Sequence, residues 1–228
     1  MNTNVNLSAA LGMLGFLGVS FAFTVLGLLA LHALVVRRYG RATVSVLGLA
    51  LVAAVYGGLV LAFSLASEGR VLARGEEKYF CEIDCHLAYS VAGVRRAKEL
   101  GVEAARATAR GEFLIVRLKT RFDEDTISPR RGDAPLHPNP RHATVRDGEG
   151  RAYEASEEGR YALATEGSVG MPLDTPLRPG ESYTTELVFD LPAGARDPVL
   201  LLNESSPETR FIIGHENSPL HKKTEFKL

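Results

Sequence analysis

Two long stretches near the start of the chain consist almost entirely of apolar residues. Leu11 to Val36 and Thr43 to Ala66 contain no Asp, Glu, Lys or Arg, and the first stretch has His32 near its end as its one titratable side chain. Each stretch exceeds the roughly 20 residues that a helix needs to cross about 30 Å of hydrocarbon. The pattern predicts two transmembrane helices, with residues 1–67 as a membrane anchor and residues 68–78 as a juxtamembrane linker.

The arginines give this anchor an orientation. Arg37, Arg38 and Arg41 occupy the connection between the two stretches, whereas residues 1–10 carry no Lys or Arg. A signal peptide needs basic residues before its apolar core, so the first stretch is predicted to be retained. Because positively charged loops stay in the cytoplasm, we expect the Arg37–Arg41 loop inside the cell and both termini outside.

From residue 79 the pattern changes to short apolar segments separated by Gly, Pro and charged residues. Glu112–Phe122 and Tyr183–Leu191 alternate apolar and polar positions, as half-buried strands do. Asp147-Gly148-Glu149-Gly150 predicts a hairpin turn inside Ala143–Ala155. Arg95–Arg110 is Ala-rich, charged and weakly helical in pattern. Further strands are expected at Leu87–Val94, Pro198–Leu202, Arg210–Ile213 and Thr224–Leu228. Seven or so short strands without a long helix predict an antiparallel β-sandwich over residues 79–228.

Three segments of this region carry a resemblance. They are Ala88–Ala97, Gly111–Phe122 and a later pair, Leu177–Ser182 with its Pro-Gly-Glu-Ser turn and Leu187–Pro192 with Val-Phe-Asp-Leu-Pro. Together they resemble a family of bacterial extracytoplasmic immunoglobulin-like domains of unknown function, often tethered to membranes or lipids. The resemblance implies an immunoglobulin-like sandwich outside the inner (cytoplasmic) membrane of a bacterium, and it implies no activity.

The chain has two cysteines, and both lie in one short motif at the start of this region. Cys81 and Cys85 are separated by three residues, and His86 follows directly. One interpretation is a disulfide, which forms readily outside the cytoplasm. The protein would then be a structural or interaction protein, such as an accessory subunit of a membrane complex.

A second interpretation of the motif is a metal site. Thiolates from Cys81 and Cys85 with imidazoles from His86, His215 or His221 would form a nitrogen–sulfur site that suits copper, or zinc as an alternative. In an immunoglobulin-like sandwich the first strand commonly runs parallel to the last. We therefore expect the residues leading into each, including His215 and His221, to lie at the same end as the cysteines. Electron transfer or metal handling at the membrane is the function this interpretation favours.

The layout is also similar to subunit II of haem–copper cytochrome oxidases, which has two transmembrane helices and an outer β-domain with Cys-x-x-x-Cys. By that similarity Cys81 and Cys85 would bridge a dinuclear copper centre. The His and Met that follow the cysteines in that family are Tyr89 and Ala92 here, and the Glu between its cysteines is displaced to Glu82. The imidazoles would then come from residues 214–223.

A third interpretation is covalent haem c, because Cys81-x-x-x-Cys85-His86 is one residue longer than the usual attachment motif. His86 would then be the axial ligand of the iron.

The sequence lacks several motifs that are typical of enzymes. There is no Gly-x-Ser-x-Gly, no His-Glu-x-x-His and no Gly-rich phosphate loop, so neither a hydrolase nor a transferase is indicated. A formal net charge of −1 gives no reason to expect nucleic acid as a partner. The expected partners are the lipid bilayer and another membrane protein, for example a respiratory-type complex.

Overall fold

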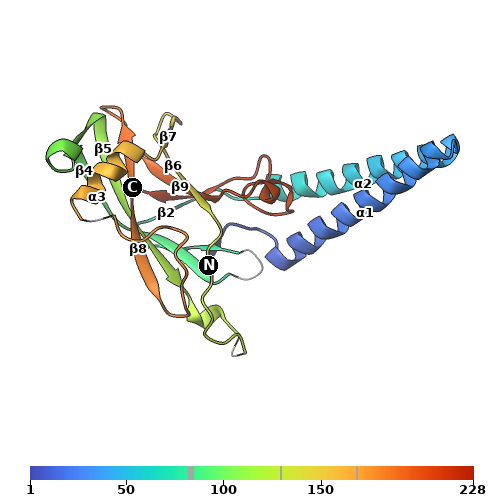
Figure 1. The fold of residues 1–228 in the computed structure, drawn as a ribbon, viewed down its shortest axis with the longest axis horizontal. Coiled ribbons are helices and arrows are strands. Elements are labelled where there is room, and N and C mark those ends of the chain that lie inside the picture. The colour runs from blue at the N-terminus through green and yellow to red at the C-terminus, as the bar shows by residue number, and fades with distance from the viewer. Residues whose placement is uncertain (82–84, 129, 168) are drawn as a thin grey trace.

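The computed structural model describes residues 1–81, 85–128, 130–167 and 169–228. It consists of two long helices followed by a β-rich domain. Figure 1 shows the helices projecting from one end of this domain as a hairpin, while both chain termini lie within the domain. The helical part is therefore a single excursion out of the β-rich domain and back into it.

The hairpin is formed by the two apolar stretches. Helix α1 spans Ala9–Val35 and helix α2 spans Tyr39–Leu65, each with 27 residues. Arg37 adopts a left-handed backbone conformation (φ 58°) in the tight turn between them. Both helices are long and apolar enough to cross a membrane, and only 6% of the most apolar window of each is buried. They are thus neither covered by the β-rich domain nor part of its core.

The first sheet has five strands in the order β1-β3-β4-β5-β8. Their bounds are Asn2–Thr3, Lys78–Phe80, Leu87–Leu100, Ala107–Phe122 and Ser182–Leu191. The long β4–β5 hairpin dominates this sheet, with its register running from Leu87 opposite Phe122 to Leu100 opposite Ala107. Strand β1 pairs with β3 in parallel, whereas the other pairs are antiparallel. Asn2 and Thr3, which precede α1, therefore belong to the sheet.

The second sheet also has five strands, in the order β2-β10-β9-β6-β7. Their bounds are Arg70–Leu72, Thr224–Lys227, Val199–Glu204, Arg141–Arg146 and Ala152–Glu154. Strand β2 pairs with β10 in parallel, so an early strand does run beside the last one, although it is formed by residues expected to be a linker. With parallel pairs in both, the sheets are mixed rather than purely antiparallel.

The two sheets share one hydrophobic core. Phe80, Tyr89 and Leu118 from the first sheet and Leu202 and Phe226 from the second are buried in the same cluster. A smaller cluster lies on the other face of β5 and β8, beneath helix α3 (Glu157–Thr165). Helix α3 begins at Ser156, whose hydroxyl accepts a hydrogen bond from the backbone of Gly159 as an N-cap.

Two expectations about local structure are wrong. Arg95–Arg110 does not form an α-helix, because its first six residues continue β4 and pair across the hairpin with β5 before the chain turns at Gly101. Cross-strand pairing thus overrides the helical tendency of the alanines. Arg210–Ile213 is not a strand, because Pro207 opens a 3₁₀ helix over Pro207–Phe211. Two other short 3₁₀ helices lie at Glu103–Ala105 and Glu124–Thr126.

Candidate functional site

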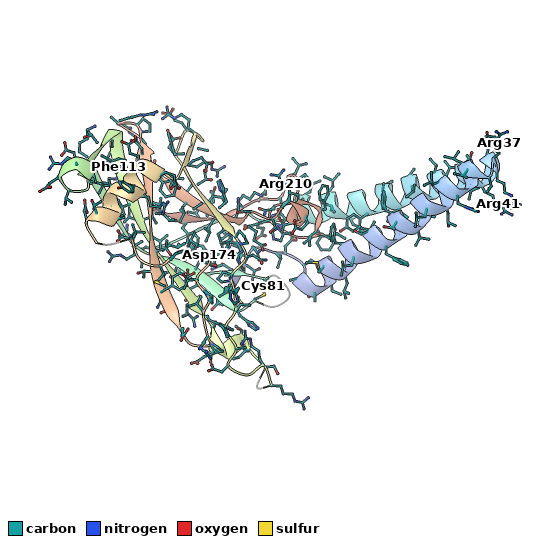
Figure 2. The ribbon with its side chains drawn as sticks, in the orientation of Figure 1. Arg37, Arg41, Cys81, Phe113, Asp174 and Arg210 are labelled. Carbon is teal, nitrogen blue, oxygen red and sulfur yellow. A yellow bond between two sulfur atoms is a disulfide. The ribbon has the colours of Figure 1, made fainter. Side chains whose placement is uncertain are left out.

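The cysteine motif lies at the end of the β-rich domain that faces the helices. Figure 2 places Cys81 there, with Arg37 and Arg41 at the opposite tip of the hairpin. Cys81 and Cys85 form a disulfide, with their Cα atoms 4.1 Å apart. Their sulfurs are therefore not thiolate ligands in this structure. Glu82, which the oxidase similarity singles out, lies outside the described residues.

His86 is buried beside the 3₁₀ turn that follows β5. Its Nδ1 lies 2.7 Å from the hydroxyl of Thr126, which itself donates to the carbonyl of Asp123 at 2.7 Å. Because the Thr126 proton is committed to that carbonyl, Nδ1 of His86 is the donor to the hydroxyl oxygen. The imidazole also stacks on the ring of Phe122, with centroids 5.5 Å apart. These contacts give His86 a packing role against the first sheet.

His215 lies closer to the disulfide. Its Nδ1 accepts the backbone N–H of Asn217 at 3.0 Å, so the ring proton is on Nε2, which donates to Glu204 Oε2 at 2.7 Å. Asn4 connects this imidazole to the cysteine motif. Its Oδ1 accepts the backbone N–H of Cys81 at 2.8 Å, and its Nδ2 donates at 3.4 Å to Glu204 Oε2, the same oxygen that accepts from His215. Cys81 and His215 also line one small cavity of about 70 Å³.

His221 lies apart from that group, in a larger cavity of about 290 Å³ next to the outer ends of the helices. Its Nδ1 donates to the carbonyl of Lys222 at 2.6 Å. Burial lowers the pKa of its imidazole below the ordinary value. The structure thus brings His215 near Cys81, as expected from the topology, but gives His86 and His221 different surroundings. Among the described residues, no group of three or more His, Cys, Asp or Glu side chains could hold a metal.

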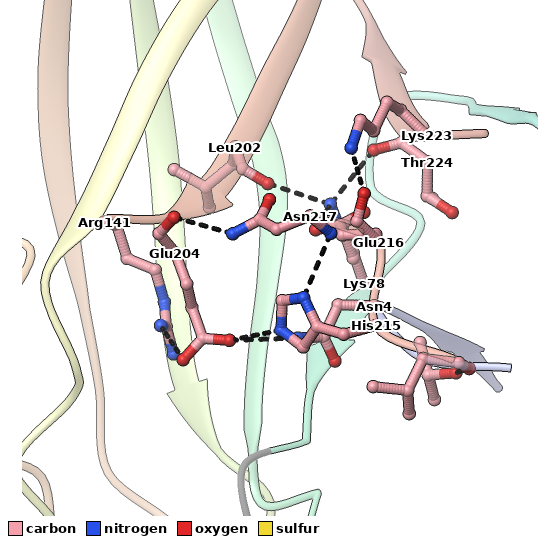
Figure 3. Close-up of polar contacts among 12 residues, drawn as sticks. Asn4, Lys78, Arg141, Leu202, Glu204, His215, Glu216, Asn217, Lys223 and Thr224 are labelled. Carbon is pink, nitrogen blue, oxygen red and sulfur yellow. Dashed lines mark hydrogen bonds and ion pairs between the residues drawn. The ribbon is translucent and has the colours of Figure 1, made fainter. Parts of the chain in front are cut away.

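The main polar feature at this end of the domain is a buried ionic cluster that the sequence did not reveal (Figure 3). Lys78, at the start of β3, donates from Nζ to Glu216 Oε1 at 2.8 Å and to the carbonyls of Leu202 and Thr224 at 2.8 and 3.1 Å. These three acceptors use the full donor capacity of an ammonium group. Burial lowers the pKa of Lys78, and the charge of Glu216 opposes that effect.

A second part of the cluster centres on Glu204 at the end of β9. Its Oε1 lies 3.2 Å from a guanidinium nitrogen of Arg141 and accepts from Asn139 Nδ2 at 3.1 Å, while Oε2 accepts from His215. The guanidinium of Arg141 also lies over the ring of Phe80, 4.3 Å from its centroid. Arg141 and Glu204 are both buried, so the pair is shielded from solvent screening.

Sequence patterns gave little warning of this cluster. Lys78 ends a short charged run after Glu76 and Glu77, Glu216 lies in a distant turn-rich segment, and no periodicity or spacing links the two. Asn4 lies in an N-terminal segment that was expected to be only the lead-in to the anchor. The one available signal was the polar segment 214–223, which was singled out for its histidines.

The cluster also joins the domain to the hairpin. The N-terminal segment lies against residues 214–216, with Asn6 N–H donating to Gly214 O and Glu216 N–H donating to Asn4 O, each at 2.8 Å. Asn6 Nδ2 donates to the carbonyl of Phe63 in α2 at 2.8 Å, and the backbone of Lys222 donates to Ser67 Oγ at 2.9 Å. The end of the domain that carries the cluster is thus bonded directly to the end of α2.

Comparison with known proteins gives little further guidance. No protein-family model matches the chain, and a search of curated proteins finds no match. Three solved bacterial structures are similar to it. A conserved hypothetical protein from Bacillus anthracis is 13% identical, covering 53% of this chain and 84% of its own, with a TM-score of 0.41.

The other two similar structures overlap more of the chain. The secreted protein MPT63 of Mycobacterium tuberculosis is 10% identical and covers 71% of this chain and 98% of its own, with a TM-score of 0.43. The yjhA protein of Bacillus subtilis is 16% identical, covering 71% and 99%, also with a TM-score of 0.43. Similarity at this level transfers no activity, ligand or partner to this chain.

Proposed function

We propose that the protein is a membrane-anchored accessory subunit, with an immunoglobulin-like β-sandwich outside the cytoplasm that binds another membrane protein. The observation that carries this proposal is the direct bonding between the domain and the anchor. Asn6 bonds to Phe63, Lys222 bonds to Ser67, and the buried cluster fixes both segments to the sheets. Such a connection holds the domain at a fixed height and tilt, as suits a subunit that docks against a membrane partner.

The surface of the hairpin supports the membrane location. Large apolar side chains of both helices face outward, among them Phe21 at 72%, Leu14 at 64% and Leu51 at 65% exposure. Soluble monomers rarely expose apolar patches of this extent, whereas a bilayer covers them favourably. The Cys81–Cys85 disulfide supports an oxidising compartment for the domain, and the arginine-rich turn supports a cytoplasmic hairpin tip.

Impermeant maleimide labelling of whole cells tests the membrane location, because the native cysteines are bonded to each other. Gly40→Cys places a thiol at the hairpin tip, where a Cβ meets nothing within 4 Å, and Glu149→Cys places one on an exposed turn of the domain. We expect Glu149→Cys to react in intact cells and Gly40→Cys to react only after the membrane is opened. Labelling of Gly40→Cys in intact cells would show the opposite orientation.

A photo-crosslinking residue at position 161 tests the partner. Tyr161 on α3 is 69% exposed, and exposed aromatic side chains are enriched at protein interfaces. Helix α3 lies at the end of the domain away from the hairpin (Figure 1). We expect the part of the partner that projects from the membrane to contact the domain there. We expect one membrane protein to crosslink at position 161, with Glu149 as the matched exposed control site. Crosslinks at position 161 that are no more specific than those at position 149 argue against the accessory role.

A further inference from the structure

A loop of the β-rich domain extends down the side of the hairpin. This descending loop comprises residues 206–214 and includes the 3₁₀ helix η3, Pro207–Phe211. In Figures 1 and 2 it lies against the end of α2 nearest the sheets, and Arg210 lies beside that helix rather than beside the sheets. The hydroxyl of Tyr56 in α2 donates to the carbonyl of Phe211 at 2.7 Å, so the tip of the loop contacts the helix directly.

The contact with Tyr56 fixes how far the loop descends. Helix α2 ends at Leu65, and at 1.5 Å per residue Tyr56 lies about 13 Å back along the helix axis. Helix α1 is contacted near its start, at Gly12 and Gly15, three and six residues after Ala9. A Cβ placed on Gly12 would lie 2.8 Å from the carbonyl oxygen of Ile213, and one on Gly15 would lie 3.6 Å from Ile213 Cδ1. The loop therefore packs against the first two turns of α1 and reaches the side chain of Tyr56 in α2.

The depth of the loop in the bilayer follows from the length of the helices. Each helix has 27 residues, about 40 Å, whereas the hydrocarbon layer is about 30 Å thick. With the arginine-rich turn at the cytoplasmic surface, about 20 residues of α2 from Ala42 reach Leu61. Leu61 then marks the boundary between the headgroups and the acyl chains of the outer leaflet, and Tyr56 lies five residues, about 7.5 Å, on the acyl side of it. The tip of the loop, which the Tyr56 hydroxyl contacts, therefore lies close to this boundary.

The side chains at the tip match that environment. Phe211 is 60% exposed although it is large and apolar, and Arg210 next to it is exposed and basic. At a membrane interface the ring of a Phe enters the acyl boundary while a neighbouring Arg extends its guanidinium to the phosphates. Tyr56, which anchors the loop, is itself of the residue type that concentrates at this depth.

We propose that the descending loop is a lipid-binding element that inserts Phe211 into the headgroup–acyl boundary of the outer leaflet. The inference rests on the proposed membrane location. The bilayer then surrounds the two helices and also binds the β-rich domain directly, through this loop. Lipid contact at the loop and helix contact at Tyr56 together set the tilt of the domain relative to the membrane.

The absence of tryptophan from the chain permits a direct measurement of depth. Three single-tryptophan variants of the full-length protein are reconstituted into phosphatidylcholine–phosphatidylglycerol vesicles. Phe211→Trp reports on the loop, Phe21→Trp reports on the exposed face of α1, and Tyr161→Trp reports on the far end of the domain. Quenching is measured with lipids brominated on the acyl chains and with iodide in the water.

The three variants separate the inference from the proposal on which it rests. We expect brominated lipid to quench Phe21→Trp and Phe211→Trp, with Phe211→Trp most sensitive to bromines near the carbonyl end of the chains. Tyr161→Trp should respond to iodide alone. If Phe21→Trp is quenched by brominated lipid but Phe211→Trp behaves like Tyr161→Trp, the lipid-binding loop is wrong and the anchor stands. If Phe21→Trp is insensitive, the membrane location itself is wrong.

A measurement on the unaltered chain guards against an effect of the substitution. A phospholipid with a photoreactive diazirine near its carbonyl groups is incorporated into the same vesicles, and crosslinked peptides are mapped by mass spectrometry. We expect crosslinks on the peptide that contains Phe211 and none on the peptide that contains Tyr161. Crosslinks confined to α1 and α2 would overturn the inference.

Discussion

Lys78 Nζ lies 2.8 Å from Glu216 Oε1, and the two side chains are 0% and 2% exposed. Lys78 belongs to β3 in the first sheet, whereas the carbonyls of Leu202 and Thr224 that it also contacts belong to β9 and β10 in the second. The backbone N–H of Glu216 in turn donates to the carbonyl of Asn4 in the N-terminal segment. One ammonium group thus connects both sheets and the segment that leads into α1.

Glu216→Gln tests this connection. The substitution keeps the shape of the side chain but removes the negative charge that compensates the buried ammonium of Lys78. Breaking a buried pair by removing one partner typically costs about 3–5 kcal/mol, because the remaining charge stays out of water. We expect a loss of that size in the free energy of unfolding, measured by urea titration of the full-length protein in detergent.

The matched control is the exposed ion pair of α3. Glu157 and Arg160 lie 2.6 Å apart but are 76% and 62% exposed, so Glu157→Gln should change the stability by less than about 1 kcal/mol. Replacing both members of the buried pair, Lys78→Met with Glu216→Leu, should restore much of the loss from Glu216→Gln. Equal effects of the two Glu→Gln variants would contradict a stabilising role for the buried pair.

Patterns that depend on neighbouring residues were predictable from the sequence. The uncharged stretches predicted both helices, and the alternation of apolar and polar residues predicted the strands at 112–122 and 183–191. The Asp147–Gly150 turn forms between β6 and β7, where Asp147 accepts hydrogen bonds from the backbone of Glu149 and Arg151. Helix α3 was missed although Ser156, Glu157 and Glu158 form a recognisable helix start.

Contacts between distant segments were not predictable in the same way. Strand β1 has two residues, and its pairing with β3 depends on a hairpin of two helices returning the chain to the same place. The Lys78–Glu216 pair also depends on the chain returning to the domain after the two helices. Neither residue alone therefore predicts the pair from the sequence. His215 does lie near Cys81, as expected, but Asn4 lies between them and bonds to the backbone of Cys81. The sulfur of Cys81 is in a disulfide, and the imidazole of His215 donates to the carboxylate of Glu204.

Acid should destabilise the domain through Glu204. Burial alone raises the pKa of this carboxyl, but the hydrogen bond from His215 and the charge of Arg141 outweigh burial and lower the pKa from 4.5 to about 2. Because the folded pKa lies below the unfolded one, the stabilisation is fully present above pH 4.5 and is lost as the pH falls toward 2. A shift of this extent corresponds to on the order of 3 kcal/mol.

Urea titrations of the wild type and Glu204→Gln between pH 2 and pH 7 measure this contribution. The difference in unfolding free energy should be largest above pH 4.5 and shrink toward pH 2. Glu149→Gln, at a position 74% exposed, should leave the pH dependence unchanged. A constant difference between Glu204→Gln and the wild type at every pH would show that Glu204 acts through packing and not through its charge.

The state of the cysteines separates the accessory role from the predicted copper site. We expect native protein, unfolded without reductant, to show no free thiol, and its melting temperature to be unaffected by a chelator or by added copper or zinc. The disulfide closes a ring of five residues, for which loop entropy predicts about 2 kcal/mol of stabilisation. The Cys81→Ser, Cys85→Ser double variant should lose that amount and remain folded. Metal-protected thiols in the native protein would restore the copper prediction.

Gly12→Ala tests how tightly the descending loop packs on α1. The new methyl group would lie 2.8 Å from the carbonyl oxygen of Ile213 and 2.9 Å from Ile212 Cγ2, so the loop must move. Such overpacking typically costs about 1–3 kcal/mol, which exceeds the roughly 1 kcal/mol that Ala gains over Gly within a helix. We therefore expect a lower melting temperature and a weaker Tyr56–Phe211 contact.

Gly18→Ala is the matched control on the same helix, because a Cβ at that position meets nothing within 4 Å. Only the helix preference acts there, so this variant should be as stable as the wild type or slightly more stable. The opposite signs expected for two identical substitutions, six residues apart on α1, isolate the contact with the loop from any general effect on the anchor. If both variants stabilise the protein equally, the loop is free to retreat from α1, and Tyr56 alone holds it against the hairpin.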